Sequence, residues 1–207
     1  MDHERGLLRA PSELTLVRHG QTEWSVTGKH TGRTDIPLTD LGRRQADALG
    51  EMLAGDEFDL VLSSPLARAW ETMAGAGFGN AGVAKDDLLE WDYGEYEGRT
   101  TAEIREEIPE WSVWTHPIDG GERVEDLGKR ADRVVALALE GDGPVLVFAH
   151  GHILRVLAAR WIGLRPADGR LLRLDTATVS TVGWERENRV IRTWNIACHL
   201  GSEESSS

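Results

Sequence analysis

Three short apolar runs, each ending directly in polar residues, constrain the fold of this chain most strongly. Residues 14–17, 60–62 and 144–149 are too apolar for strands with one solvent-facing side, and helical patterns separate them. Alternating strands and helices predict an α/β protein, a three-layer α/β/α fold with a mostly parallel central sheet. In such sheets ligands bind beyond the carboxyl ends of the strands, so the residues that follow these runs are candidates for a site.

Helix signals lie between the runs. Thr39 is placed to cap a helix, and Pro65 suits the first turn of a second helix that the glycine-rich residues 75–82 would stop. Residues 124–138 carry an apolar stripe with helical spacing, and Gly151 begins a further helix. These positions predict a helix after each of the first two strands and on both sides of the third.

The remaining stretches are less regular. A polar loop is expected up to Pro37, and residues 86–120, rich in acids and tryptophan, are expected to form a small cap or lid. Two late runs, 178–184 and 189–194, predict a β-hairpin. The hairpin offers an exposed sheet edge through which a homodimer could form.

The length of 207 residues suits one domain over residues 1–207, with a core at 12–197 and a disordered tail at 201–207. The single cysteine, Cys198, excludes an internal disulfide, and no run approaches the roughly 20 apolar residues that span a bilayer. The start has no apolar stretch of the kind found in signal peptides. We therefore expect a cytoplasmic protein with no membrane association.

The net charge of −12 argues against non-specific binding to nucleic acid or anionic membranes. An anionic ligand would therefore need a locally basic pocket. Such a pocket is predicted where the strands end, because Arg18 and His19 follow the first run, Arg68 follows the second and His150 follows the third. Clustered cations repel one another unless an anion lies between them, and the planar fork of arginine matches phosphate oxygens. A neutral histidine at such a site can attack phosphorus and carry the phosphoryl group.

Four motifs in order carry a family resemblance. They are Arg18-His-Gly-Gln-Thr22 with the Gly32–Thr39 segment, Ser63-Ser-Pro-Leu-Ala-Arg68, Glu90-Trp-Asp-Tyr-Gly94 with Glu97-Gly98, and Ala149-His-Gly-His152. Together they resemble the histidine phosphatase superfamily, which includes the phosphoglycerate mutases. The resemblance covers roughly residues 13–195 and implies a phosphoglycerate-mutase-like fold.

The resemblance also implies roles for residues. His19 would be the nucleophile, and Arg18, Arg68 and His150 would hold the phosphoryl oxygens. Glu90 would protonate the leaving oxygen and then activate water, helped in keeping its proton if Trp91 or Trp24 lowers the local dielectric. Further phosphate contacts are expected from Ser25, Thr31, Gly32 and Gly151. No metal and no cofactor are implied, and the expected partner is a small phosphate ester.

Two departures from the family pattern favour hydrolysis. Many members have Asn where this chain has Ser25, and the surrounding string resembles a branch with acid phosphatases and sedoheptulose-bisphosphatase-like enzymes. Mutases of the family place Arg directly after the catalytic Glu, whereas Trp91 follows Glu90 here. The prediction is a metal-independent phosphomonoesterase with a mildly acidic pH optimum, and a cofactor-dependent phosphoglycerate mutase is the alternative.

Two other classes of function stay open from the residues alone. A metal-dependent hydrolase could use His150 and His152 as ligands, although Arg18 and Arg68 would repel the metal. A phosphate-binding module without activity would explain the cations but not Glu90, whose charge opposes anion binding.

Overall fold

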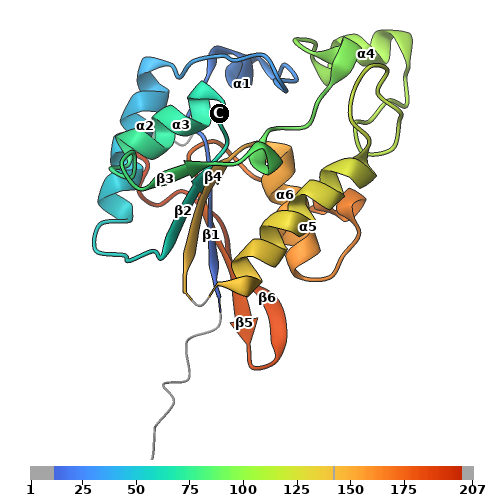
Figure 1. The fold of residues 1–207 in the computed structure, drawn as a ribbon. Helices are drawn as coiled ribbons and strands as arrows, with labels where there is room; N and C mark the ends of the chain where they lie inside the picture. The colour runs from blue at the N-terminus through green and yellow to red at the C-terminus, as the bar shows by residue number, and fades with distance from the viewer. Residues whose placement is uncertain (1–11, 142, 202–207) are drawn as a thin grey trace, which may run out of the picture.

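The computed structural model describes residues 12–141 and 143–201, and it shows a sheet with helices on both faces (Figure 1). The six strands lie in the order β3-β2-β4-β1-β5-β6. Their bounds are β1 Leu14–Arg18, β2 Leu60–Ser63, β3 Gly82–Ala84, β4 Val145–Ala149, β5 Val179–Glu185 and β6 Asn188–Ile196. The first four strands pair in parallel, and β5 and β6 are antiparallel. This confirms the predicted α/β/α fold with a mostly parallel sheet and a late hairpin.

Four helices cover the sheet (Figure 1). Helices α2 (Asp40–Met52) and α3 (Ala67–Gly75) lie on one face, and α5 (Val124–Glu140) and α6 (Gly151–Trp161) lie on the other. Consecutive strand residues point to opposite faces, so Leu16 joins the core on the α5 and α6 side while Val17 joins the core on the α2 and α3 side. Both side chains are fully buried, which explains why the strand lacks an alternating pattern.

The helix starts follow local chemistry. The Thr39 hydroxyl accepts a hydrogen bond from the Gly42 amide at 3.0 Å, which confirms the predicted cap of α2. The predicted helix start at Pro65 is wrong by two residues, because α3 begins at Ala67. Leu66 keeps an extended backbone, and its amide donates to the Ser64 hydroxyl at 3.3 Å in a turn that follows β2.

Two elements lie in stretches that were expected to be loops. A capping box between Thr22 and Ser25 begins the short helix α1 (Glu23–Thr27) inside the predicted polar loop. The strand β3, for which no strand was predicted, begins at Gly82, the last residue of the glycine-rich stretch, and forms one edge of the sheet.

Residues 86–120 contain two 3-10 turns, η1 (Asp86–Leu88) and η2 (Gly94–Tyr96), and helix α4 (Thr101–Glu107). Trp91 and Trp111 from this segment are 1% exposed and belong to the core that α5 and α6 share with the sheet. The segment therefore packs as part of one continuous core. A third 3-10 turn, η3 (Pro166–Leu171), follows α6.

The late hairpin turns at Arg186 and Glu187, where Arg186 has a φ of 54°. Of the predicted disordered tail, only Gly201 is described, and residues 202–207 lie outside the described residues. Within the described ranges, no helix is long and apolar enough to cross a membrane.

Candidate active site

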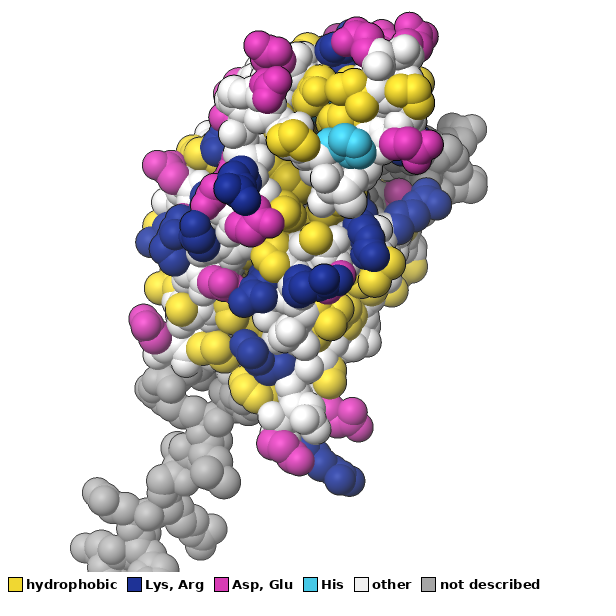
Figure 2. Space-filling model, turned by 90° about the vertical axis from the view of Figure 1, so that its right-hand side faces the viewer, with side chains coloured by type: hydrophobic (Ala, Val, Ile, Leu, Met, Phe, Trp, Pro, Cys, Tyr) yellow, Lys and Arg dark blue, Asp and Glu magenta, His cyan; other side chains and the backbone are white. Residues whose placement is uncertain are grey.

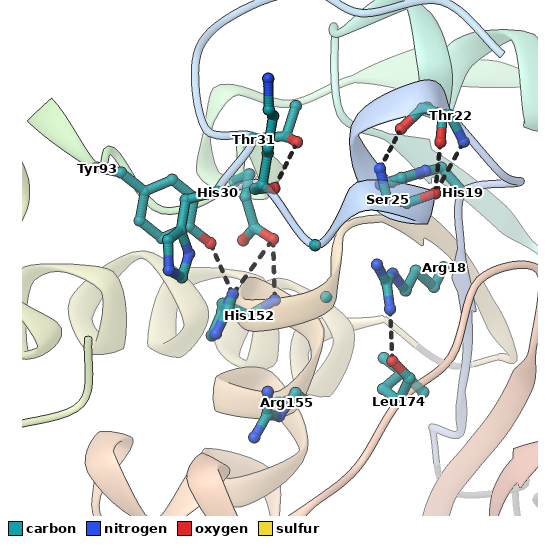
Figure 3. Close-up of a pocket in the computed structure, with 14 residues that line it drawn as sticks. Arg18, His19, Thr22, Ser25, His30, Thr31, Tyr93, His152, Arg155 and Leu174 are labelled. Atoms are coloured by element: carbon teal, nitrogen blue, oxygen red, sulfur yellow. Dashed lines mark hydrogen bonds and ion pairs between the residues drawn. The ribbon is translucent and has the colours of Figure 1, made fainter. Parts of the chain in front are cut away.

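A pocket lies at the carboxyl ends of β1 and β4, where the sequence predicts a site (Figure 3). Four parts of the chain far apart in sequence line it: the end of β1 with the segment after it, the region of residues 90–93, the first turns of α6, and Leu174. The lining residues are Arg18, His19, Thr22, Ser25, Gly28, Lys29, His30, Thr31, Glu90, Tyr93, Gly151, His152, Arg155 and Leu174.

His19 lies directly after β1 and is 5% exposed. Its Nδ1 lies 2.7 Å from the Gly20 carbonyl oxygen, which can only accept, so Nδ1 carries the proton and Nε2 keeps a free lone pair. Burial, and then the charges of Arg68 and Arg18, hold the pKa of His19 well below its ordinary value. The imidazole is therefore neutral at neutral pH.

Helices α2 and α3 hold the loop that carries His19. The Gly20 amide donates to the Thr72 hydroxyl on α3 at 2.9 Å. Gly20 also lies against Gly42 on α2, where an added Cβ would come within 2.5 Å of the Gly42 carbonyl oxygen. Only glycine allows this approach, so two helices fix the position of the His19 ring.

Arg18 contributes a guanidinium group for which the described residues supply no carboxylate within 4.0 Å. Its Nη1 donates to the Leu174 carbonyl oxygen at 2.6 Å, and its Nε is buried without a hydrogen-bond partner. A Cβ on Gly151 would lie 3.5 Å from the Arg18 Nε, so the missing side chain leaves the guanidinium next to the first turn of α6. A buried donor without a partner is costly and indicates that a ligand completes this position.

Arg68 is fully buried and lies behind the pocket wall. Its Nε donates to His150 Nδ1 at 3.0 Å, and its two terminal nitrogens donate to the carbonyl oxygens of Thr31 (3.2 Å), Gly32 (2.9 Å) and Thr34 (3.0 Å). The backbone of Thr31 and Gly32 therefore holds Arg68 in place. A direct phosphate contact by either residue stays a prediction.

His150 links Arg68 to His19. Because Arg68 can only donate, His150 Nδ1 must accept its hydrogen bond. The proton of His150 therefore lies on Nε2, which donates to the Ser64 hydroxyl oxygen at 2.7 Å. The His150 and His19 ring centroids are 5.2 Å apart. Burial, and then Arg68 and His19, lower the pKa of His150 well below its ordinary value.

Glu90 supplies the one carboxylate among the residues that line this pocket, and it is 4% exposed. Its oxygens accept from the backbone amides of Trp91 (2.9 Å), His152 (3.0 Å) and Ile153 (3.0 Å), the last two in the first turn of α6. Burial alone would raise the pKa of Glu90, but the hydrogen bonds that it accepts, above all at His152, hold it well below its ordinary value. Contrary to the expected effect of Trp91 on the dielectric, Glu90 is ionised in this site.

The site thus combines two arginines, two histidines and one carboxylate, and a comparison with known protein families agrees with this combination. A model described as the histidine phosphatase superfamily (branch 1) matches residues 14–197. The chain belongs to the histidine phosphatase superfamily.

Relatives within this superfamily include phosphatases as well as phosphoglycerate mutases. The chain is 42% identical over 190 residues to an acid phosphatase of Mycobacterium tuberculosis, covering 90% of this chain and 93% of the relative. It is 37% identical over 182 residues to a sedoheptulose 1,7-bisphosphatase of Saccharomyces cerevisiae, covering 72% and 67%. A solved structure of the product of a Mycobacterium tuberculosis open reading frame superposes with a TM-score of 0.85 at 42% identity, covering 89% of this chain and 97% of the other. The chain is therefore a phosphatase of this superfamily.

This histidine phosphatase brings together the five residues predicted to be catalytic. Arg18, His19 and Glu90 line the pocket, and His150 and Arg68 lie directly behind His19. Ser25 also lines the pocket, but its hydroxyl accepts from the Thr22 amide at 2.9 Å and donates to the Thr22 carbonyl oxygen at 2.8 Å. With its one proton used inside the α1 cap, Ser25 has no donor for a phosphate in this conformation.

Several residues of the site were not predicted. The Tyr93 hydroxyl lies 2.6 Å from His152 Nδ1, and burial raises the pKa of Tyr93 well above its ordinary value, so the phenol keeps its proton and donates it. His30 also lines the pocket, with its ring centroid 4.8 Å from that of Tyr93, and burial lowers its pKa to about 4. The place of Tyr93 inside the Glu90–Gly94 motif was the signal that could have identified it.

Glu97 is a third residue near the site that was not predicted. One oxygen of its carboxylate accepts from the backbone amides of Gly32 at 2.8 Å and Thr34 at 3.0 Å. The carbonyls of the same two residues hold Arg68. Glu97 thus fixes the loop that positions Arg68.

The histidine pair considered as metal ligands is divided between different partners. His150 contacts Arg68 and Ser64, whereas His152 contacts Tyr93. In the part of the chain that the structure describes, no group of three or more His, Cys, Asp or Glu side chains could hold a metal ion. The donor set of this pocket suits an anion.

Proposed function

We propose that this phosphatase hydrolyses small phosphate monoesters through a phosphohistidine on Nε2 of His19. The observation that carries the proposal is the bond from His19 Nδ1–H to the Gly20 carbonyl oxygen, because it leaves a neutral Nε2 with a free lone pair beside the unpaired Arg18. A neutral, fixed imidazole nitrogen is the form required for attack on phosphorus.

In the first step the Nε2 lone pair forms a bond to phosphorus as the bond from phosphorus to the ester oxygen breaks. The ester oxygen keeps the electron pair of the broken bond and takes a proton from Glu90. It then leaves as the alcohol. Arg18 and Arg68 offset the charge on the equatorial oxygens, and His150 donates its Nε2 proton to them once its hydrogen bond to the Ser64 hydroxyl breaks. In the second step Glu90, now a carboxylate, takes a proton from water as the water oxygen attacks phosphorus and the bond to His19 breaks.

Glu90 must gain a proton before the first step, because it is ionised in the empty site. A phosphoryl group that enters beside it brings negative charge, which raises the pKa of the carboxyl group. A phosphate monoester itself loses its second proton near pH 6, as phosphorylated side chains do, so the monoanion can deliver the proton. Both effects favour activity at mildly acidic pH.

The phosphoglycerate mutase alternative shares the first step and differs in the acceptor of the phosphoryl group. Incubation with 3-phosphoglycerate and a trace of 2,3-bisphosphoglycerate separates the two activities. Release of inorganic phosphate supports hydrolysis, and conversion to 2-phosphoglycerate with little phosphate release supports the mutase.

The direct test is to trap the intermediate. Wild-type enzyme mixed with a phosphate ester and quenched in alkali within milliseconds should carry one acid-labile phosphoryl group on His19 by mass spectrometry. His19→Ala should carry none, should turn over at least about 10³-fold more slowly, and should remain folded by circular dichroism. A near-normal rate for His19→Ala contradicts the proposal.

A further inference from the structure

A buried ion pair lies outside the pocket, between helix α5 and the segment that precedes it. Figure 2 shows acidic and basic side chains sharing the face on the side of the cap and α5. The side chains of the pair Arg133–Asp87 are 58% and 30% exposed, whereas those of Arg130 and Glu122 are only 11% and 13% exposed. A buried ion pair often stabilises a fold no more than apolar side chains of the same volume would, so the contacts of this pair indicate its role better than its charge does.

Arg130 uses all five of its N–H groups. Nε and Nη2 donate to the two carboxylate oxygens of Glu122 at 2.8 and 2.7 Å, which fixes the plane of the guanidinium group. Nη1 donates to the carbonyl oxygens of Asp87 at 2.8 Å and Leu89 at 2.7 Å, and Nη2 donates to the carbonyl oxygen of Glu90 at 3.3 Å. Arg130 therefore holds the backbone that leads into Glu90.

Glu122 holds the backbone that follows Glu90. Its amide donates to the Asp92 carbonyl oxygen at 3.0 Å, and its own carbonyl oxygen accepts from the Trp91 indole nitrogen at 2.7 Å. The Trp91 amide in turn donates to the Glu90 carboxylate at 2.9 Å. Together, Arg130 and Glu122 hold the chain on both sides of Glu90.

Two helices thus fix the two ends of Glu90. The carboxylate accepts from the amides of His152 and Ile153 at the start of α6, and Arg130 from the second turn of α5 holds the main chain. Neither Arg130 nor Glu122 is among the residues that line the pocket, so both act on the reaction through the position of Glu90. A displacement of about 1 Å at a reacting group can lower a rate about 100-fold.

We propose that Arg130 and Glu122 are positioning residues that set where the Glu90 carboxyl group meets the departing ester oxygen. This inference rests on the proposed role of Glu90 as the general acid and adds the pair that keeps this acid in place. Hydrolysis of an ester whose leaving group needs a proton should therefore depend on the pair. Hydrolysis of an ester whose leaving group departs as a stable anion should not.

The test removes both charges together, because the loss of one would leave the other buried and unpaired. The paired variant Arg130→Met with Glu122→Gln keeps similar side-chain volumes and the main-chain bonds of residue 122, and it loses the bonds of the guanidinium group. Two esters with rings of similar size are compared. p-Nitrophenyl phosphate releases a stabilised phenolate, whereas benzyl phosphate releases an alkoxide that needs a proton. Release of the alcohol or phenol in a single turnover measures the first chemical step.

The paired variant should release benzyl alcohol about 100-fold more slowly than wild type and p-nitrophenol within about fivefold of it. Arg130→Lys keeps the charge but cannot reach Glu122 and the backbone carbonyls together, so it should show an intermediate loss confined to benzyl phosphate. In a Glu90→Gln background, the paired substitution should slow benzyl phosphate by about twofold at most, because the acid that the pair positions is already lost.

Arg133→Met is the matched control. Arg133 lies three residues further along α5 and bonds to the Asp87 carboxylate at 2.6 Å and not to the Glu90 main chain. Its loss should leave both esters within about twofold of wild type. Circular dichroism checks the fold of every variant, and Arg130→Lys carries the test if the paired variant does not fold.

Glu90→Gln separates failure of this inference from failure of the proposed function. If Glu90→Gln slows benzyl phosphate far more than p-nitrophenyl phosphate but the paired variant slows both equally, or neither, the pair only supports the fold. The inference is then overturned and the proposed function stands. If Glu90→Gln slows both esters equally, Glu90 is not the general acid, and the proposed mechanism and the inference fail together.

Discussion

The Arg68 Nε donates to His150 Nδ1 across 3.0 Å, and this bond determines how the second histidine faces the site. It fixes the proton of His150 on Nε2, and it places a fully buried positive charge next to two neutral imidazoles. Arg68 therefore sets the hydrogen-bonding direction of His150, and it adds to burial in lowering the pKa of His19.

Replacement of Arg68 should impair chemistry more than folding. Arg68→Lys keeps the charge but cannot reach His150 and the loop carbonyls together, so we expect kcat to fall about 10²- to 10³-fold, the usual cost of losing a transition-state donor. Steady-state kinetics measure the loss, and circular dichroism checks the fold. Full activity in Arg68→Lys would show that the bonds to His150 and the loop are dispensable.

Glu97 should act on activity through Arg68. Glu97→Ala removes both bonds to the amides of Gly32 and Thr34, which frees the carbonyls that hold Arg68, so we expect kcat/KM to fall about tenfold or more. Glu97→Gln keeps an oxygen acceptor in the same place and is the matched control. It should remain within a few-fold of wild type, and equal losses in the two variants would contradict the role.

The pH profile should report the environment of His19. Its folded pKa lies below the ordinary 6.5, so the imidazole stays neutral, and able to attack, as the pH falls below that value. The acid limb of kcat/KM should therefore lie below pH 6.5. Arg18→Gln removes one of the charges that lower this pKa, so its residual activity should show an acid limb at higher pH. A limb that moves down, or stays in place, would contradict the proposed coupling.

Inorganic phosphate should stabilise the folded protein. It would lie among Arg18, Arg68 and the two histidines, and a ligand at 100 times its Kd adds about 2.7 kcal/mol to the free energy of unfolding. For a chain of this size we expect a rise in Tm of about 5–10 °C. Sodium chloride at equal ionic strength is the control, and Arg18→Gln should lose most of the shift. Equal shifts with chloride and phosphate would mean that no specific anion site exists.

Chelation should leave activity intact, because arginine side chains occupy the positions at which a metal would otherwise neutralise the phosphoryl charge. Prolonged dialysis against EDTA, followed by assay with EDTA present, measures this. Loss of activity that a divalent cation restores would favour a metal-dependent reaction instead.

Sequence patterns predicted the central strands, the main helices and the cations at their ends because those features depend on local composition. Helix α1 escaped prediction because it is five residues long and polar, and β3 because it is three residues long and begins with glycine. The ionisation of Glu90 escaped because it depends on amides of α6, 62 and 63 residues away in the chain. Likewise, nothing local to Glu97 indicates that it contacts Gly32, 65 residues earlier.

The strand order also has a consequence for biosynthesis. β4, which begins at residue 145, lies between β1 and β2, so the two earlier strands cannot be bridged until most of the chain has left the ribosome. Until then, each of β1 and β2 has an edge whose backbone groups lack a partner and can pair with the wrong strand. Pairing between strands that are far apart in the sequence also slows folding. The active site therefore forms only after β4 has been inserted between β1 and β2. A polypeptide that ends before β4 would be inactive and prone to aggregate.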